Sequence, residues 1–73
     1  MASRFSRRNL RAQLDESGKR PEDLAVAIDR SFYAVRAYLS GQCNPPARMI
    51  GAMADELGCD PGDLFEQTDE VRA

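Results

Sequence analysis

The residues best suited to chemistry lie on the segment 32–40, where polar and aromatic types alternate with apolar ones. At 100° per residue, a helix here places an aromatic ring, a cation, a methyl group and a hydroxyl in one sector: Tyr33, Arg36, Ala37 and Ser40. The opposite sector holds Val35, Tyr38 and Leu39, and Phe32 lies on the boundary. We therefore expect the second sector to face a core and the first to face outward, where it can bind a partner.

The sequence lacks the residues that catalysis or metal binding usually requires. The sequence contains no His and two Cys, Cys43 and Cys59, which form neither a disulfide framework nor a zinc set. Paired acids such as Asp15 and Glu16 are neighbours on predicted solvent faces, with no apolar pocket to raise a carboxyl pKa. We expect a non-enzyme without a metal, a cofactor or a small-molecule ligand. Free thiols are the simplest state of both Cys, although one bridge between them is conceivable.

Length and hydropathy limit the class of protein. Seventy-three residues make one small domain, whose core must come from a few well-packed elements. The mean hydropathy of −0.52 and the lack of a long apolar run argue against a membrane span, and the first eight residues contain no apolar stretch suited to secretion. We therefore expect a cytoplasmic protein that has no membrane partner.

Charge is segregated along the chain. Residues 1–48 carry nine of the ten basic residues and five of the twelve acidic ones, a net charge of +4. Residues 49–73 carry one basic and seven acidic residues, a net charge of −6. The acidic part can simply keep a small protein in solution, or the basic part can face a polyanion while the acidic part faces away.

Ser, Pro and Gly stand at positions that are typical of the starts and ends of helices, and no segment shows the alternation of a strand. These signals predict an all-α fold. Five helices are expected: from Ser6 to Gly18, from Pro21 to Asp29, over 32–40, between Pro46 and Gly58, and between Asp60 and Glu66. We assign residues 1–5 to an N-terminal arm, 6–66 to the folded domain and 67–73 to a short acidic tail. The turn between the second and third helices is so short that the two must cross steeply, which pushes the outer face of the third out as a ridge that fits a major groove.

On these residues the sequence resembles the helix-turn-helix family of phage repressors and Cro proteins, which includes bacterial xenobiotic-response-element regulators. The matching positions run from Gly18 to Phe65: Leu24, Ala25, Ser31, Val35, Tyr38, Gly41, Pro45, Leu57, Gly58, Leu64 and Phe65. The resemblance implies a compact five-helix, lambda-repressor-like DNA-binding domain. The sequence departs from the family at Pro21, where Gln is usual, and at Asp29, where Gly is usual.

By position, the resemblance implies four base-reading residues: Phe32, Tyr33, Arg36 and Ala37. It also implies four phosphate contacts: Arg20, Ser31, Ser40 and Gln42. Charge alone adds Arg7, Arg8 and Arg11 to the phosphate contacts. At Arg36, a guanidinium can bond two acceptors of guanine.

Two functions remain open at this point. The first is a sequence-specific regulator of transcription, repressor-like, that binds double-stranded DNA with residues 32–40 in the major groove. It would act as a weak homodimer, formed in solution or only on DNA, through the last helix and the loop before it. The second is a protein-interaction module on the same fold, such as a toxin antidote or a phage-encoded modulator, which the acidic C-terminal part and the apolar content of Phe32, Tyr33 and Ala37 favour.

Overall fold

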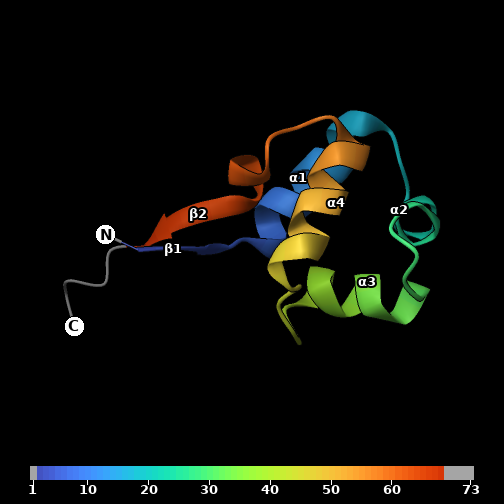
Figure 1. Cartoon of the computed structure of the whole chain (residues 1–73), viewed down its shortest axis with the longest axis horizontal. Helices are drawn as coiled ribbons and strands as arrows, with labels where there is room; N and C mark the ends of the chain where they lie inside the picture. Colours follow the sequence, from blue (N-terminus) through green and yellow to red (C-terminus); the bar gives the residue numbers. More distant parts are fainter. Residues whose placement is uncertain (1, 69–73) are drawn as a thin grey trace.

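The computed structural model describes residues 2–68, which form four α-helices, one 3-10 turn and a two-stranded antiparallel sheet (Figure 1). In chain order the elements are β1 (Ala2–Phe5), α1 (Arg7–Ser17), α2 (Pro21–Ala27), α3 (Phe32–Ser40), α4 (Ala47–Leu57), η1 (Pro61–Leu64) and β2 (Phe65–Thr68). The helices make the body of the molecule, and the sheet extends from one side of it (Figure 1).

Helix α1 begins and ends where the capping residues predict. The Ser6 hydroxyl accepts a hydrogen bond from the Asn9 amide at 3.0 Å, which satisfies one amide that the first turn leaves free. Gly18 closes the helix at φ 74°, a left-handed conformation that costs glycine little. Ser6 is itself 3% exposed, and its amide donates to the Leu64 carbonyl at 2.8 Å. The cap therefore also joins the start of α1 to η1.

A four-residue turn joins α2 to α3, and the two helices pack against each other. The Arg30 amide donates to the Ala25 carbonyl at 3.0 Å, which ties the turn back to α2. Ser31 caps α3, because its hydroxyl accepts from the Ala34 amide at 3.1 Å. Between them Asp29 has φ 59°, a conformation that Asp tolerates better than most residues but that glycine adopts freely.

Replacing Asp29 with glycine is expected to stabilise the fold. Glycine removes the backbone strain at φ 59° but gains freedom in the unfolded chain, so the net gain is about 0.5 kcal/mol, or about 3 °C in Tm. Asp29→Ala keeps the strain without the local tolerance of Asp and is expected to cost about 1 kcal/mol. Thermal unfolding of both variants checks the pair. An Asp29→Gly variant that melts below Asp29→Ala would contradict this account of the turn.

Each helical element contributes at least one fully buried side chain to a single core, the largest being Leu10, Leu24, Val35, Met53 and Leu64. The predicted inward positions Tyr38 and Leu39 are also buried, at 3% and 8% exposed. Helical spacing identified these positions, and the structure confirms that they face inward. In a chain this short, every element must bury part of itself in the same core.

The prediction of a fifth helix between Asp60 and Glu66 is wrong. The predicted start signals work, since the Asp60 amide donates to the Asp63 carboxylate at 3.1 Å, but the turn is a 3-10 helix that ends at Leu64. Phe65 is already extended, at φ −110° and ψ 153°, and begins β2. Its pairing across the sheet replaces the next helical turn, so the fold has four α-helices within the described residues.

The expectation of an all-α fold with a separate arm and tail is also corrected. Residues 2–5 pair antiparallel with 65–68, with Phe5 opposite Phe65 and Arg4 opposite Glu66. The Arg4 Nε lies 3.1 Å from Glu66 Oε2 across the strands. The described part of the arm and the first two residues of the expected tail, 67 and 68, thus belong to one sheet. Residues 69–73 of the tail, and Met1, lie outside the described residues.

Candidate functional site

Helix α3 has one inward and one outward face, as its sequence predicts. Tyr33 is 80% exposed and Arg36 is exposed, whereas Val35 between them is completely buried. Ala37 is half-buried and continues the outward face. An exposed fraction of 80% is unusual for tyrosine, whose ring is mostly covered in folded proteins. The outward placement of this set is therefore confirmed.

Phe32 and Arg36 contact each other one helical turn apart. Phe32 is 36% exposed, and the Arg36 guanidinium carbon lies 5.7 Å from the centre of its ring. The Tyr33 ring packs beside Phe32, with centres 6.2 Å apart and planes tilted by 58°. A cation over an aromatic face at an exposed site gains about 0.5–1 kcal/mol. Phe32 therefore restricts the Arg36 side chain and holds it on the outward face.

A shallow hollow lies along the outward face of α3 and brings together five predicted site residues: Tyr33, Arg36, Ala37, Ser40 and Gln42. Two of these residues are fixed at its end, where the Ser40 hydroxyl and the Gln42 amide both bond the Ala37 carbonyl, at 3.2 and 3.0 Å. The Ser40 oxygen keeps its acceptor positions, and the Gln42 side chain is exposed. The hollow thus offers hydrogen-bonding groups beside an aromatic ring and a methyl group.

Two further predicted phosphate contacts flank α2 and α3. Ser31 is exposed, and its hydroxyl proton stays available because the oxygen serves as the acceptor of the cap. Arg20 is exposed, with its Nε 3.8 Å from the Asp23 carboxylate and its backbone amide 3.2 Å from the same group. Since this pair is exposed, it is worth at most about 1 kcal/mol and leaves Arg20 accessible.

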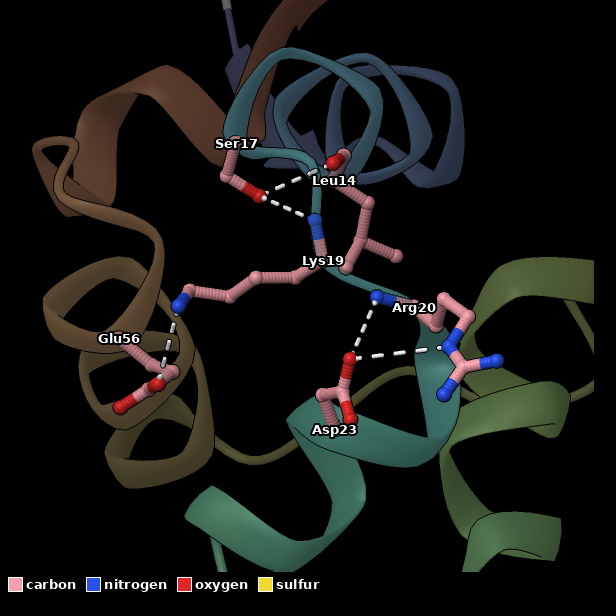
Figure 2. A network of polar contacts seen from close by, with 6 residues as sticks. All are labelled: Leu14, Ser17, Lys19, Arg20, Asp23 and Glu56. Carbon is pink, nitrogen blue, oxygen red and sulfur yellow. Dashed lines mark hydrogen bonds and ion pairs between the residues drawn. The ribbon is translucent and has the colours of Figure 1, made fainter.

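The link between α1 and α2 is held by a small polar network, shown in Figure 2. The Ser17 hydroxyl donates to the Leu14 carbonyl at 2.9 Å and accepts from the Lys19 amide at 3.3 Å. The Lys19 ammonium lies 3.5 Å from Glu56 of α4. Arg20 follows directly, so this network sets the direction in which the chain enters α2 and presents Arg20 (Figure 2).

The arginines that charge alone selected are placed differently from one another. Arg8 and Arg11 are exposed on α1, as a phosphate contact requires. Arg7 instead folds over the end of α3, where its Nη1 donates to the Ser40 carbonyl. A cation at a helix C-terminus is favourable because the last carbonyls there are unpaired and carry partial negative charge. Arg7 therefore fastens the start of α1 to the end of α3.

A second hollow lies beside the first and shares no lining residue with it. Of its nine lining residues, only Arg7 and Arg8 were predicted as site residues; those that sequence reasoning missed include Arg4, Tyr38 and Asn44. Arg4 takes its place only through the sheet, which no pattern predicted. Tyr38 was correctly placed in the core, and no sequence signal shows that its hydroxyl end reaches a hollow.

The two cysteines are free thiols, Cys43 exposed and Cys59 half-buried. Burial raises the pKa of Cys59 above the usual value of a thiol, and the nearby carboxylates of Asp63, Asp60 and Glu16 raise it further. The thiol form therefore predominates at neutral pH, which makes Cys59 a poor nucleophile. No group of His, Cys, Asp and Glu among residues 2–68 is arranged to hold a metal ion.

The alkylation of Cys59 is expected to need a more alkaline pH than the alkylation of a free cysteine. The thiolate is the reacting species, and burial together with three carboxylates disfavours it. The measurement is the pH profile of the iodoacetamide rate on a Cys43→Ser variant, with a short cysteine peptide as reference. A midpoint at or below that of the peptide would show that Cys59 is not shielded as described.

Comparisons of the chain with models of protein families, with curated proteins and with solved structures found no match. Within the described residues, no helix is both long enough and apolar enough to cross a membrane.

Proposed function

We propose that this protein binds double-stranded DNA in a sequence-specific way, with α3 in the major groove, and regulates transcription as a repressor-like factor. One observation carries the proposal: Tyr33, Arg36 and Ala37 share the outward face of a helix whose opposite face is fixed in the core. A helix that presents donors and apolar groups together, on a rigid support, is what reading base edges requires.

The pairing of α2 with α3 supports a helix-turn-helix arrangement. The turn between them is short, and both ends are fixed, by the Arg30 amide bond to α2 and by the Ser31 cap of α3. Asp29 has positive φ at the position where the helix-turn-helix family usually has Gly. The resemblance in sequence and this local geometry point to the same pair of helices.

Each outward residue has a defined part in the proposed complex. Arg36 bonds the two acceptors of a guanine, since a guanidinium matches the O6 and N7 edge. Tyr33 contacts a thymine methyl group or a phosphate, and Ala37 contacts a thymine methyl group. Phe32, partly exposed, supports Arg36 through the ring contact and touches the base edge only if that contact opens. Phe32 is thus proposed mainly as a positioning residue.

The distribution of charge supports the same orientation. Exposed basic and polar residues lie on α1, just before α2 and at the two ends of α3: Arg8, Arg11, Arg20, Ser31, Ser40 and Gln42. These residues are proposed to contact phosphates. Figure 1 shows that α4 begins near α3 and runs away from it, toward the turn that leads to η1. Asp55 near the end of α4, together with Asp60 and Asp63 at η1, is exposed, and we propose that these acids face away from the DNA.

One α3 contacts only a few base pairs, so we propose that two copies bind two half-sites. Half-sites about 34–36 Å apart present the same face of the duplex to both copies. The residues proposed for the dimer contact, between Gly58 and Leu64, are η1 and the turn before it. A weak dimer of this kind forms in solution or only on DNA.

Selection of bound sequences from a random duplex library tests the proposal. The full chain is expected to enrich one motif with two related half-sites, and sedimentation of the complex is expected to show two copies per duplex. A library that shows no enriched motif at any salt concentration would refute sequence-specific binding. A motif bound by one copy would refute the dimer and leave the role of α3 intact.

The second candidate is a protein-interaction module, which the exposed apolar side chains of α2 and α3 favour. Val26 is 83% exposed and Tyr33 is 80% exposed. Heparin chromatography at low salt discriminates the two candidates. Retention of a protein with a pI of about 5.0 indicates a segregated basic face and favours DNA. No retention, together with a protein that co-purifies with the chain, favours the module.

A further inference from the structure

The second hollow, which we call the α1 pocket, lies where the start of α1, the sheet and the loop after α3 meet. Six side chains in its lining carry the argument: Arg4, Arg7, Arg8, Tyr38, Asn44 and Glu66. They come from five different segments of the chain, so the pocket exists only in the folded protein. It is separate from the hollow on the outward face of α3.

One nearly buried residue of this pocket, Tyr38, carries a polar group that has no hydrogen-bond partner among the described residues. Tyr38 is 3% exposed and still lines the pocket. Its hydroxyl makes no hydrogen bond with another described residue, yet no fully buried side-chain oxygen in residues 2–68 lacks a partner. The Tyr38 hydroxyl therefore keeps some accessible surface, and the pocket is an opening that Tyr38 lines. A phenol held in this way is available to donate a hydrogen bond to a ligand.

Two backbone donors belong to residues that line the same pocket. Ser6 accepts from the amides of Asn9 and Leu10, through its hydroxyl and its carbonyl. The amides of Arg7 and Arg8, the first two of the 11-residue helix, have no partner among the described residues. Amides at a helix N-terminus carry partial positive charge and favour an anion.

The charge of the pocket is also positive. Three arginines face one carboxylate, Glu66, which is already paired with Arg4 at 3.1 Å. Arg7 is held by the Ser40 carbonyl through one of its five N–H groups, which leaves others free. Arg8 makes no ion pair within residues 2–68 and is exposed. The charged side chains that line the pocket therefore carry a net charge of +2.

We propose that the α1 pocket binds a phosphate group, with the Tyr38 hydroxyl, the Arg8 guanidinium and the α1 amides as donors. The Asn44 side-chain amide adds a further donor at the rim. The phosphate belongs either to a DNA backbone or to a free phosphate ion. The assignment of the phosphate to a DNA backbone rests on the proposed function, whereas the proposal that the pocket binds phosphate does not. The DNA source is favoured because Tyr38 belongs to α3 and Arg7 bonds the end of that helix.

The first arm of the test uses inorganic phosphate and the full chain. Phosphate, added at constant ionic strength with chloride as the reference anion, is expected to shift the amide NMR signals of Arg7 and Arg8. Tyr38→Phe removes only the hydroxyl and keeps the buried ring, and Arg8→Gln removes one exposed charge. Each is expected to weaken phosphate binding about ten-fold. Arg30→Gln, an exposed arginine outside the pocket, is the matched control and is expected to bind phosphate as the unaltered chain does.

The second arm identifies the source. If the pocket holds a DNA phosphate, Arg8→Gln lowers the slope of log affinity against log salt by about 1, and Tyr38→Phe weakens duplex binding. If both variants lose phosphate binding but keep the duplex affinity and slope, the pocket stands and its ligand is free phosphate. If the variants lose phosphate binding and the unaltered chain binds no duplex at all, the pocket again stands as a site for free phosphate. Only the proposed function is then refuted. The pocket proposal is overturned if phosphate leaves the Arg7 and Arg8 amide signals unmoved. It is also overturned if a folded Tyr38→Phe variant and Arg8→Gln both bind phosphate as tightly as the unaltered chain does.

Discussion

Replacing Leu24 with alanine is expected to lower the free energy of unfolding by about 2–5 kcal/mol, whereas Val26→Ala changes it by at most about 0.5 kcal/mol. Both residues belong to α2 and both changes shorten an aliphatic side chain. Leu24 is completely buried and its loss leaves a cavity, but Val26 is 83% exposed. A domain of this size has a total stability of about 4–11 kcal/mol, so Leu24→Ala removes a large share of it.

Urea unfolding followed by circular dichroism measures both variants, with the midpoint and slope compared to those of the unaltered chain. The position of α2 matters for function because this helix supports α3 from behind. Equal destabilisation by the two substitutions would mean that α2 presents a different face to the core. The inference that Tyr33, Arg36 and Ala37 face outward from α3 would then lose its support as well, because α3 packs against α2.

Much of the helical part of the fold could be predicted because its signals are local. Ser6 and Ser31 cap helices, and Gly18, Gly41 and Gly58 end them with positive φ, as the sequence indicates. Such signals act within a few residues of one another, and an isolated sequence therefore contains them in full. Helical spacing likewise identified the buried positions.

The sheet could not be predicted, because its two strands have only four residues each and lie at opposite ends of the chain. Four residues are too few for an alternating pattern to be recognised. Phe65 carries a sequence signal that fits a short helix, and its partner Phe5 is sixty residues away. The pairing therefore decides the conformation of Phe65 from outside its own neighbourhood, and the predicted fifth helix gives way to a strand.

The candidate site divides in the same way. The outward face of α3 follows from its period, so Tyr33, Arg36 and Ala37 could be selected from the sequence. The contact of Arg36 with Phe32 depends on side-chain rotamers, and the bond of Arg7 to the Ser40 carbonyl depends on how α1 meets α3. These contacts are tertiary, and only the structure shows them.

Arg36→Ala is expected to weaken binding to the selected duplex by about 1–3 kcal/mol, or about 5- to 150-fold, and to relax the preference at one base pair. The reason is the loss of two hydrogen bonds to a guanine from the outward face of α3. Arg36→Lys is the matched variant, since it keeps the charge but not the paired donors. It is expected to keep the salt dependence of binding and still lose the base preference.

Measurement by electrophoretic shift, on the selected duplex and on one with the guanine replaced, separates these effects. If Arg36 reads a base, both variants bind the two duplexes about equally well, whereas the unaltered chain discriminates between them. If Arg36 contacts only a phosphate, Arg36→Lys discriminates as well as the unaltered chain does, and Arg36→Ala merely lowers the salt slope by about 1. Unchanged affinity, discrimination and salt slope in Arg36→Ala would show that α3 does not lie in the groove. The exposed set of Tyr33, Arg36 and Ala37 would then favour the protein-interaction module, because a surface that contacts no DNA but exposes Tyr33 at 80% is suited to an apolar partner.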